Sequence, residues 1–191
     1  TTAILSFLLD SLGSKPSFLI GGVSQDLGTN HQLGSGPFFV VEGDEYDTAF
    51  FDKRSKFLHY KPDYVILNNI EFDHADIFKN FAAVEHTFSL LLKQIKDPSK
   101  IIANIDDPGV FNLLSKMHLI DKVTQVAAFG KSHNTPNFLQ KAYYKQKDKL
   151  WTAHIQIKKK NLQLETSLSG LHNMANLTQA LTCLSKIEQD T

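Results

Sequence analysis

The sequence predicts an α/β fold in which a mostly parallel sheet is flanked by helices and carries a small appended antiparallel β-hairpin sheet. Short, continuously apolar runs alternate with segments of helical periodicity, and such runs are typical of parallel strands buried on both faces. Nearer the C-terminus, apolar and polar residues alternate one by one, which is typical of half-buried antiparallel strands. The predicted strands of the first kind are 17–20, 38–41, 64–67, 100–105 and 123–129.

The predicted helices lie between these strands. Over residues 1–12 apolar side chains recur at helical spacing, and Gly13 stands where a C-terminal cap belongs. A second amphipathic helix is predicted over 80–96. A third begins after Asp107, which can cap a helix whose first residue is Pro108. The Gly- and Ser-rich segment between the first two strands predicts a loop.

The pattern changes in the last third of the chain. Residues 151–157 and 162–168 alternate apolar with polar side chains and predict a hairpin, while the Lys-rich segment 141–149 predicts a surface strand or loop. A closing helix follows Gly170. The predicted divisions are a parallel α/β core over 1–138, antiparallel strands over 139–169 and a closing helix over 170–191.

Composition narrows the class of protein. The chain has 191 residues, and Lys+Arg and Asp+Glu both number 20, which argues against a general nucleic-acid binder. The single cysteine, Cys183, rules out an internal disulfide framework and fits a reducing compartment. No apolar run approaches the roughly 20 residues that would cross a membrane, so no membrane insertion is expected. The start lacks an initiator Met, and we expect the chain to be a piece of a longer one.

The stretch that follows the second strand is strongly acidic. Its carboxylates are Glu42, Asp44, Glu45 and Asp47. Like charges this close are costly to desolvate, so a cationic group is expected nearby. Ligands of open α/β sheets bind where strands end, and Mg²⁺ prefers hard oxygen ligands, so the stretch indicates a magnesium site. A solvated acidic turn is the alternative interpretation.

Further polar groups stand at other element ends. The strand over 64–67 is followed by Asn69, Asp73 and His74, and the histidine could ligate a metal while a neighbouring carboxylate orients it. A structural or exposed histidine is the alternative. Thr1 and Thr2 could give hydroxyls and free N–H groups to a phosphate, or act as ordinary helix caps.

The segment 48–60 combines several phenylalanines with a basic trio. Lys53, Arg54 and Lys56 could bind an anionic substrate. They could equally form the solvated face of a helix.

Four short motifs occur in an order and spacing that resemble the central, ATP-binding domain of the Mur ligases, a P-loop NTPase-like fold. The motifs are 42–47, 69–76, 104–108 and 170–176. Together they span nearly the whole chain. Within the family, segments 46–57, 59–60 and 18–23 resemble the murein-peptide ligase branch.

This resemblance implies an ATP-dependent reaction of peptidoglycan recycling. The tripeptide L-alanyl-γ-D-glutamyl-meso-diaminopimelate would be joined to UDP-N-acetylmuramate through an acyl phosphate. Mg²⁺ and cationic groups would neutralise the phosphates. The alternatives are the alanine-adding ligase of the same family and a non-catalytic nucleotide-binding module. The sequence does not predict the oligomeric state.

The resemblance also assigns residues. Glu42 and His74 match the positions that hold Mg²⁺, with Asn69 and Asp73 supporting the second of them. Positions that contact adenine in the family are matched by Asn104, His172, Asn173 and Asn176, whose side chains can donate and accept at a base edge. Lys53 and Arg54 mark the branch, with substrate contact as their candidate role. No lysine lies between Lys79 and Lys93, so no carbamylated lysine is expected.

The chain lacks several segments that the resemblance would lead us to expect. The phosphate loop, the N-terminal UDP-sugar domain and the C-terminal domain have no counterpart in it, and Thr1 and Thr2 match the end of the loop's threonine run. We therefore expect these 191 residues alone to be inactive and to bind ATP poorly.

Overall fold

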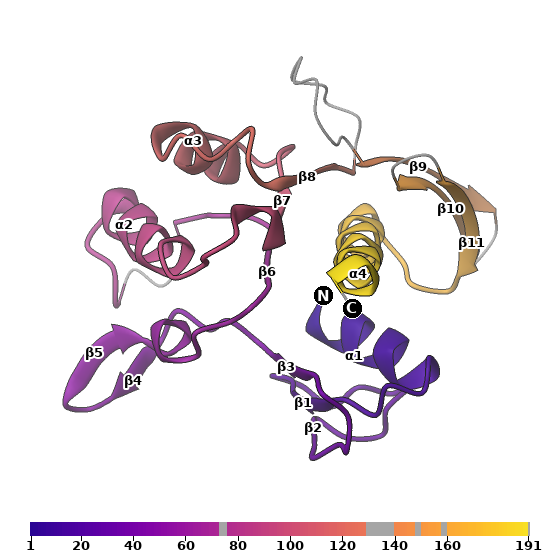
Figure 1. Ribbon diagram of the computed structural model, residues 1–191, viewed down its shortest axis with the longest axis horizontal. Helices are drawn as coiled ribbons and strands as arrows, with labels where there is room; N and C mark the ends of the chain where they lie inside the picture. Colours follow the sequence, from indigo (N-terminus) through magenta and orange to yellow (C-terminus); the bar gives the residue numbers. More distant parts are fainter. Residues whose placement is uncertain (73–75, 129–139, 148–149, 158–159, 191) are drawn as a thin grey trace.

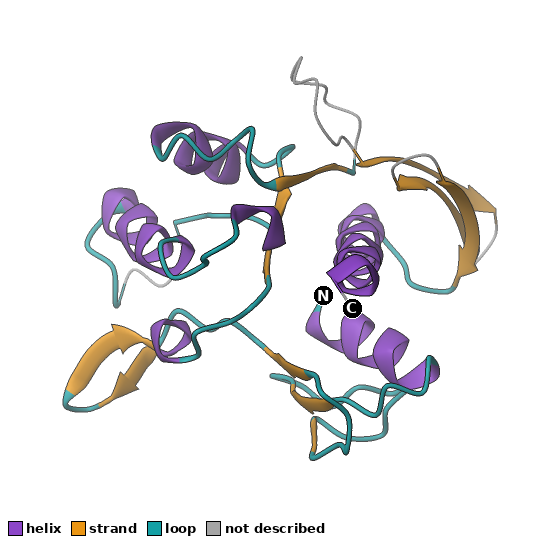
Figure 2. Cartoon of the chain, viewed as in Figure 1, coloured by secondary structure: helices purple, strands orange, loops and turns teal. Residues whose placement is uncertain are grey.

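Within the described residues, four α-helices flank a central row of strands in the computed structural model (Figures 1 and 2). One face is covered by α2 (Phe81–Leu92) and α3 (Pro108–Lys116), and the other by α1 (Thr2–Ser11) and α4 (Leu171–Asp190). The α/β architecture and the flanking helices are as predicted. The structure describes residues 1–72, 76–128, 140–147, 150–157 and 160–190.

The larger sheet has six strands in the order β11-β10-β9-β8-β7-β6. Neighbours from β6 to β9 pair in parallel, and β9, β10 and β11 pair antiparallel. The antiparallel strands therefore continue the parallel sheet through the β8–β9 pair. Their bounds are β6 (Val65–Leu67), β7 (Ile101–Asn104), β8 (Thr124–Ala127), β9 (Gln140–Lys147), β10 (Leu150–Ile157) and β11 (Lys160–Thr166).

A separate three-stranded sheet has the order β2-β1-β3. Strand β1 (Ser17–Leu19) pairs in parallel with β3 (Phe39–Val41), and Phe18 lies opposite Val40. Strand β2 (His31–Gln32) pairs antiparallel with β1 inside the segment predicted as a loop. Both strands of the parallel pair were predicted. Strand β2 was not, because a strand of two residues is too short to show an alternating pattern in the sequence.

The helix interpretation of segment 48–60 is wrong. It forms a hairpin of β4 (Asp47–Ala49) and β5 (Asp52–Ser55), followed by the 3₁₀ helix η1 (Lys56–His59). Hydroxyl groups hold the turn together: the Thr48 hydroxyl donates to the Arg54 carbonyl at 2.8 Å, and Ser55 donates to Glu45 at 2.7 Å. These side-chain bonds compete with helix formation.

Two predicted caps are present, and a third cap, at Asn80, was not predicted. Gly13 has a φ of 76°, in the left-handed region that favours glycine at the end of a helix. The Asp107 side chain accepts from Val110 N at 2.8 Å, with Pro108 at the first helical position. Asn80 caps α2 by accepting from Ala83 N at 3.0 Å.

The core is divided by the sheet. Apolar residues of η1, α2 and α3 pack on one face, and those of α1 and α4 on the other. Strand β7 passes between these layers, and Ile101, Ile102 and Ala103 are completely buried, as predicted for a central parallel strand. Beyond β9, the inward side chains of β10 pack against α4, and the Tyr144 hydroxyl lies 2.7 Å from that of Thr178.

Strand β3 differs from its prediction. Its apolar sequence indicates burial on both faces, yet Phe39 is 63% exposed, and Val40 and Val41 are only half-buried. The physical reason is its position: β3 is the edge strand of its sheet, and its other edge faces a cavity.

Candidate functional site

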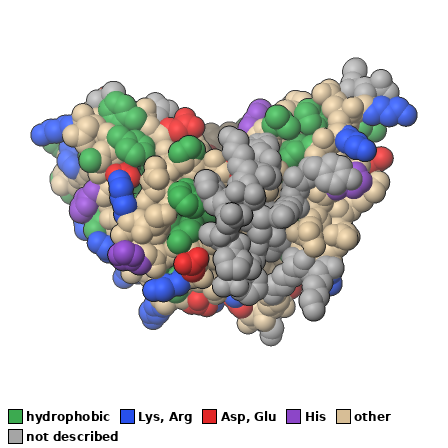
Figure 3. Space-filling view, turned by 90° about the horizontal axis from the view of Figure 1, so that it is seen from above, with side chains coloured by type: hydrophobic (Ala, Val, Ile, Leu, Met, Phe, Trp, Pro, Cys, Tyr) green, Lys and Arg blue, Asp and Glu red, His purple; other side chains and the backbone are tan. Residues whose placement is uncertain are grey.

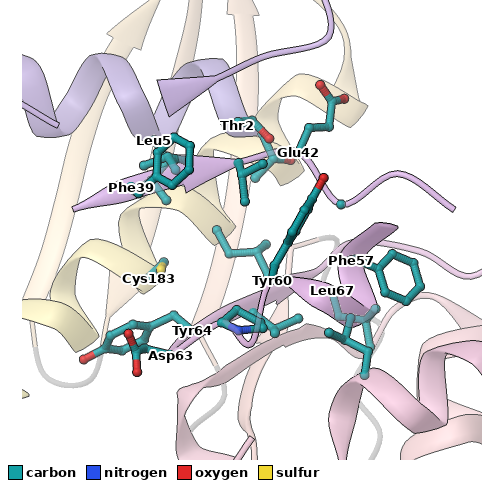
Figure 4. A pocket seen from close by; sticks show the side chains of 18 of the residues that line it. Thr2, Leu5, Phe39, Glu42, Phe57, Tyr60, Asp63, Tyr64, Leu67 and Cys183 are labelled. Carbon is teal, nitrogen blue, oxygen red and sulfur yellow. The ribbon is translucent and has the colours of Figure 1, made fainter. Parts of the chain in front are cut away.

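A cavity of about 810 Å³ lies between the edge strands of the two sheets, β3 and β6. Figure 4 shows it in close view, with Phe39 and Leu67 on strands at opposite sides. Polar residues line the end where both strands terminate. They are Thr1, Thr2, Glu42, Asn68 and Asn69. Because parallel strands share a carboxyl edge, this end is where an α/β sheet presents its ligand-binding groups.

Glu42 follows β3 directly and is exposed. Its carboxylate accepts a hydrogen bond from the backbone N–H of Gly21, with 2.6 Å between Oε2 and N. Gly21 follows β1, the neighbour of β3, so the adjacent strand end orients this side chain. A fixed, exposed carboxylate at the cavity mouth is suited to bind a cation.

The rest of the acidic stretch has other partners. Asp44 pairs with Lys56 at 3.2 Å, and Asp47 pairs with Lys53 at 2.7 Å. The cationic groups expected beside these carboxylates therefore include Lys53 of the hairpin and Lys56 of η1. Sequence alone could not separate Glu42 from Asp44 and Asp47, which do not line the cavity.

A chain of hydrogen bonds joins three elements at the cavity end. The amide of Asn68, at the end of β6, donates to the Thr1 hydroxyl at 2.9 Å. The Thr1 hydroxyl donates in turn to the Asn176 side-chain oxygen on α4, also at 2.9 Å. The start of α1 is thereby held between β6 and α4.

Asn104 extends this network to β7. Its side-chain N–H donates to the Asn68 carbonyl at 2.9 Å, and its side-chain oxygen accepts from Asp106 N at 3.2 Å. One N–H donor and one lone pair of the amide remain for another partner. Next to it, the Asp107 carboxylate that caps α3 also accepts from Ile70 N at 3.2 Å. The ends of β6 and β7 are thus locked together.

One feature of this end of the cavity concerns an unpaired polar atom. The side-chain oxygen of Asn68 is buried without a hydrogen-bond partner in the described part of the chain. An acceptor left unpaired in this way is costly, so a donor or a cation would stabilise it.

The residues present fit magnesium as a partner of phosphate. Glu42, Thr1 and Asn68 offer carboxylate, hydroxyl and amide oxygens, the hard ligands that Mg²⁺ takes. Among the described residues, no three His, Cys, Asp or Glu side chains come together as a metal-binding group. In protein sites Mg²⁺ usually keeps several waters and ligand phosphates in its shell.

The structure unites some predicted site residues and leaves others apart. Thr1, Asn104 and Asn176 are joined through Asn68, which the sequence reasoning missed although it is the first polar residue after a predicted strand. Glu42, Thr2 and Asn69 line the same cavity. His172 is exposed at the start of α4, where Asn173 donates to the Ser169 carbonyl at 2.8 Å. His74 and Asp73 lie outside the described residues.

Lys53 and Arg54 do not line the cavity. Their hairpin projects from the sheet (Figure 1), and its tip carries Phe50 and Phe51, which are 93% and 91% exposed. Arg54 donates to both carboxylate oxygens of Asp52, at 2.9 and 2.7 Å, and so holds the pKa of Asp52 well below its ordinary value. Both basic side chains are thus paired in the structure.

The described surface has no dominant charge on the face drawn in Figure 3, where basic, acidic and apolar side chains are interspersed. Among the described helices, none has the length and hydrophobicity of a membrane-spanning segment.

A family model described as the Mur ligase middle domain matches residues 2–184. The chain belongs to the Mur ligase family. The match covers the helix that starts at the cavity, the sheet and most of α4. The expected family resemblance is therefore confirmed.

Individual Mur ligases show the same relationship. Over 115 residues the chain is 43% identical to the UDP-N-acetylmuramate–L-alanyl-γ-D-glutamyl-meso-2,6-diaminoheptandioate ligase of Haemophilus influenzae, covering 60% of this chain and 25% of that protein. A UDP-N-acetylmuramate–L-alanine ligase of Borrelia garinii is 30% identical over 186 residues, 97% of this chain and 37% of its own length.

A solved structure agrees with these relatives. The chain superposes with a TM-score of 0.79 and 32% identity on the UDP-N-acetylmuramate:L-alanyl-γ-D-glutamyl-meso-diaminopimelate ligase from Neisseria meningitides, covering 97% of this chain and 57% of that one. The chain thus spans about a quarter of the first curated relative and just over half of the solved one.

Proposed function

We propose that the whole protein is an ATP-dependent ligase that joins the tripeptide L-alanyl-γ-D-glutamyl-meso-diaminopimelate to UDP-N-acetylmuramate. One observation carries the choice of substrates: the 43% identity to the Haemophilus relative, whose name states both of them, against 30% for the alanine ligase. The cavity at the carboxyl edge, with Glu42 and Thr1 at its mouth, supports a phosphate-binding role for this domain. The buried thiol of Cys183 suits the reducing cytoplasm, where we place the reaction.

The reaction brings a carboxylate close to the phosphates of ATP, and the repulsion between these anions must be neutralised. The muramate carboxylate attacks the γ-phosphorus of ATP and ADP leaves; the peptide amine then attacks the acyl phosphate, losing a proton as phosphate departs. Mg²⁺, when bound, would supply positive charge to the phosphates during these steps. Glu42 and His74 would hold it. Thr2 would donate to phosphate oxygens, and Thr1 would do so once its hydroxyl leaves Asn176.

The adenine would be bound by amide and imidazole groups. Asn104 keeps a free donor and acceptor for a base edge while its other atoms bind backbone. His172, Asn173 and Asn176 lie on the first turns of α4. Asn69 would support the loop after β6. Lys53 and Arg54 are proposed to contact the substrate only after exchanging their carboxylate partners.

The test is an assay of phosphate release by the whole protein with UDP-N-acetylmuramate and ATP. We expect release with the tripeptide and little with free L-alanine. The alanine-adding alternative is favoured by the Borrelia relative, which aligns over 97% of the chain, and it requires the reverse preference. No release with either acceptor would contradict both and leave a non-catalytic nucleotide-binding module.

A further inference from the structure

The segment that leaves strand β6 runs along the mouth of the cavity without the support of a strand ladder. The pairing of β6 with β7 ends where Leu67 lies opposite Ala103. The next two residues, Asn68 and Asn69, both line the cavity. Contacts other than the ladder must therefore fix where residues 68–70 lie.

The first of these contacts comes from the start of helix α3. The Oδ1 atom of Asp107 accepts from Val110 N at 2.8 Å, which caps α3, and also from Ile70 N at 3.2 Å. A helix cap needs only the first of these bonds. The second bond joins α3 to the segment after β6, between residues 37 positions apart in the sequence.

The second contact depends on a glycine in the first turn of α3. A Cβ built on Gly109 would overlap the carbonyl oxygen of Ile70 and would lie 3.1 Å from the Ile70 Cβ. Glycine is a weaker helix former than alanine, so helix propensity does not explain this residue. The close approach of the two backbones does. The Ile70 side chain is itself buried in the core that α2 and α3 share.

These contacts determine the backbone of Asn69. The carbonyl of Asn68 belongs to the peptide group before Asn69, and it accepts from the Asn104 side chain at 2.9 Å. The N–H of Ile70 belongs to the peptide group after Asn69, and it donates to Asp107. Because peptide groups are planar, binding both of them fixes φ and ψ of the residue between them. The direction in which the Asn69 side chain leaves the backbone is thereby fixed as well.

We propose that Asp107 and Gly109 are positioning residues of the nucleotide site, acting through Ile70 on the backbone of Asn69. Neither residue is among those that line the cavity, so both act without touching the nucleotide. The proposal rests on the proposed function, which assigns Asn69 to the site that binds Mg²⁺ and ATP. The competing explanation is that Asp107 only caps α3.

The test compares two substitutions of Asp107 in the whole protein, with MgADP as the probe in calorimetric titrations. Serine caps helices about as well as aspartate, but its side chain is one bond shorter. Asp107→Ser should therefore keep the bond to Val110 and lose the bond to Ile70. We expect the Kd for MgADP to rise roughly tenfold, as for other residues that orient the groups of a metal site.

Asp107→Asn separates positioning from capping. Asparagine caps as well as serine and has the reach of aspartate, so binding should return to within about threefold of the wild-type Kd. Equal Kd values for the serine and asparagine variants would reduce Asp107 to a cap and overturn the proposal. Gly109→Ala should also raise the Kd, although alanine favours the helix. Unchanged binding in Gly109→Ala would contradict its role.

The matched control is Asp97→Ser. Asp97 caps η2 (Pro98–Lys100) by accepting from Ser99 N at 3.0 Å, and it too precedes a proline. It does not line the cavity, and its substitution should leave the Kd for MgADP unchanged. A loss as large as that of Asp107→Ser would show that removing any such cap is sufficient, and would contradict the proposal.

Hydrogen exchange distinguishes failure of this proposal from failure of the proposed function. The Ile70 amide should exchange at least ~10-fold faster in Asp107→Ser than in Asp107→Asn, whatever reaction the protein catalyses. Equal exchange would show that Asp107 does not hold Ile70. Faster exchange with an unchanged Kd would overturn the positioning role and leave the proposed function standing. A wild-type protein that binds no MgADP would overturn the proposed function and this proposal with it.

Discussion

The backbone N–H of Gly21 donates to the carboxylate of Glu42, and no side chain stands between them. A Cβ built on Gly21 would lie 2.8 Å from Glu42 Oε2, closer than atoms normally approach. The end of β1 therefore sets where the carboxylate after β3 points. Since Glu42 lines the cavity where the strands end, this contact couples Gly21 to the proposed magnesium site.

The substitution Gly21→Ala should move the Glu42 carboxylate without unfolding the domain. The obstructed atom is the end of a flexible side chain, so we expect a stability change below about 1 kcal/mol. In the whole protein, the Mg²⁺ concentration for half-maximal ligation should rise roughly tenfold, as for other residues that orient a metal ligand. The control is Gly22→Ala, whose added Cβ meets nothing within 4 Å. Equal effects of the two variants would contradict the coupling.

Neutralising Glu42 itself should remove activity. Glu42→Gln keeps an oxygen for the Gly21 N–H but loses the charge, so we expect ligation to slow roughly 100-fold or more. Asp44→Asn is the comparison: Asp44 pairs with Lys56 of η1, so this variant should change the rate less than about threefold. Steady-state rates at saturating ATP, with circular dichroism to check folding, measure both. A fully active Glu42→Gln would disprove the metal assignment.

Asn104 should matter for stability as well as for nucleotide binding. Its side chain is 8% exposed and satisfies the Asn68 carbonyl and the Asp106 N–H. Asn104→Ala would leave the Asn68 carbonyl and the Asp106 N–H unpaired. We therefore expect the free energy of unfolding to fall by about 1 to 3 kcal/mol. Asn112→Ala, on the exposed face of α3, should stay within about 0.5 kcal/mol in the same urea titration. Similar losses at the two positions would argue against the network.

The thiol of Cys183 should be unreactive while the protein is folded. Burial raises its pKa to about 12, so almost none of it is thiolate at pH 8. Iodoacetamide should label it at least ~100-fold more slowly than in urea. Because the folded state favours the protonated thiol, the contribution to stability is complete below the unfolded pKa of about 8.5 and is lost as pH rises towards about 12. Rapid labelling under native conditions would show that the cavity lined by Cys183 opens to solvent.

Elements that depend on residues close together in the sequence were predicted correctly. The cap at Asp107 and the completely buried run in β7 follow from neighbouring residues, so both were predicted correctly. The hairpin at 47–55 was not, because its phenylalanines and lysines fit a helical face as well as a turn stabilised by Thr48 and Ser55 hydroxyls. For the site, the sequence indicated Glu42 and Thr1 but not Asn68. The predicted roles of His74 and Asp73 stay predictions.

The sequence by itself determined where strands and helices form and that carboxylates and amides follow the strand ends, because periodicity and caps depend on residues a few positions apart. Only the tertiary structure decided which of these groups meet. The bond between Thr1 and Asn176 joins residues 175 positions apart, and its formation depends on how α1 and α4 pack beside β6. The exposure of β3 was likewise decided by its sheet neighbours, because a strand's burial depends on what lies at both of its edges.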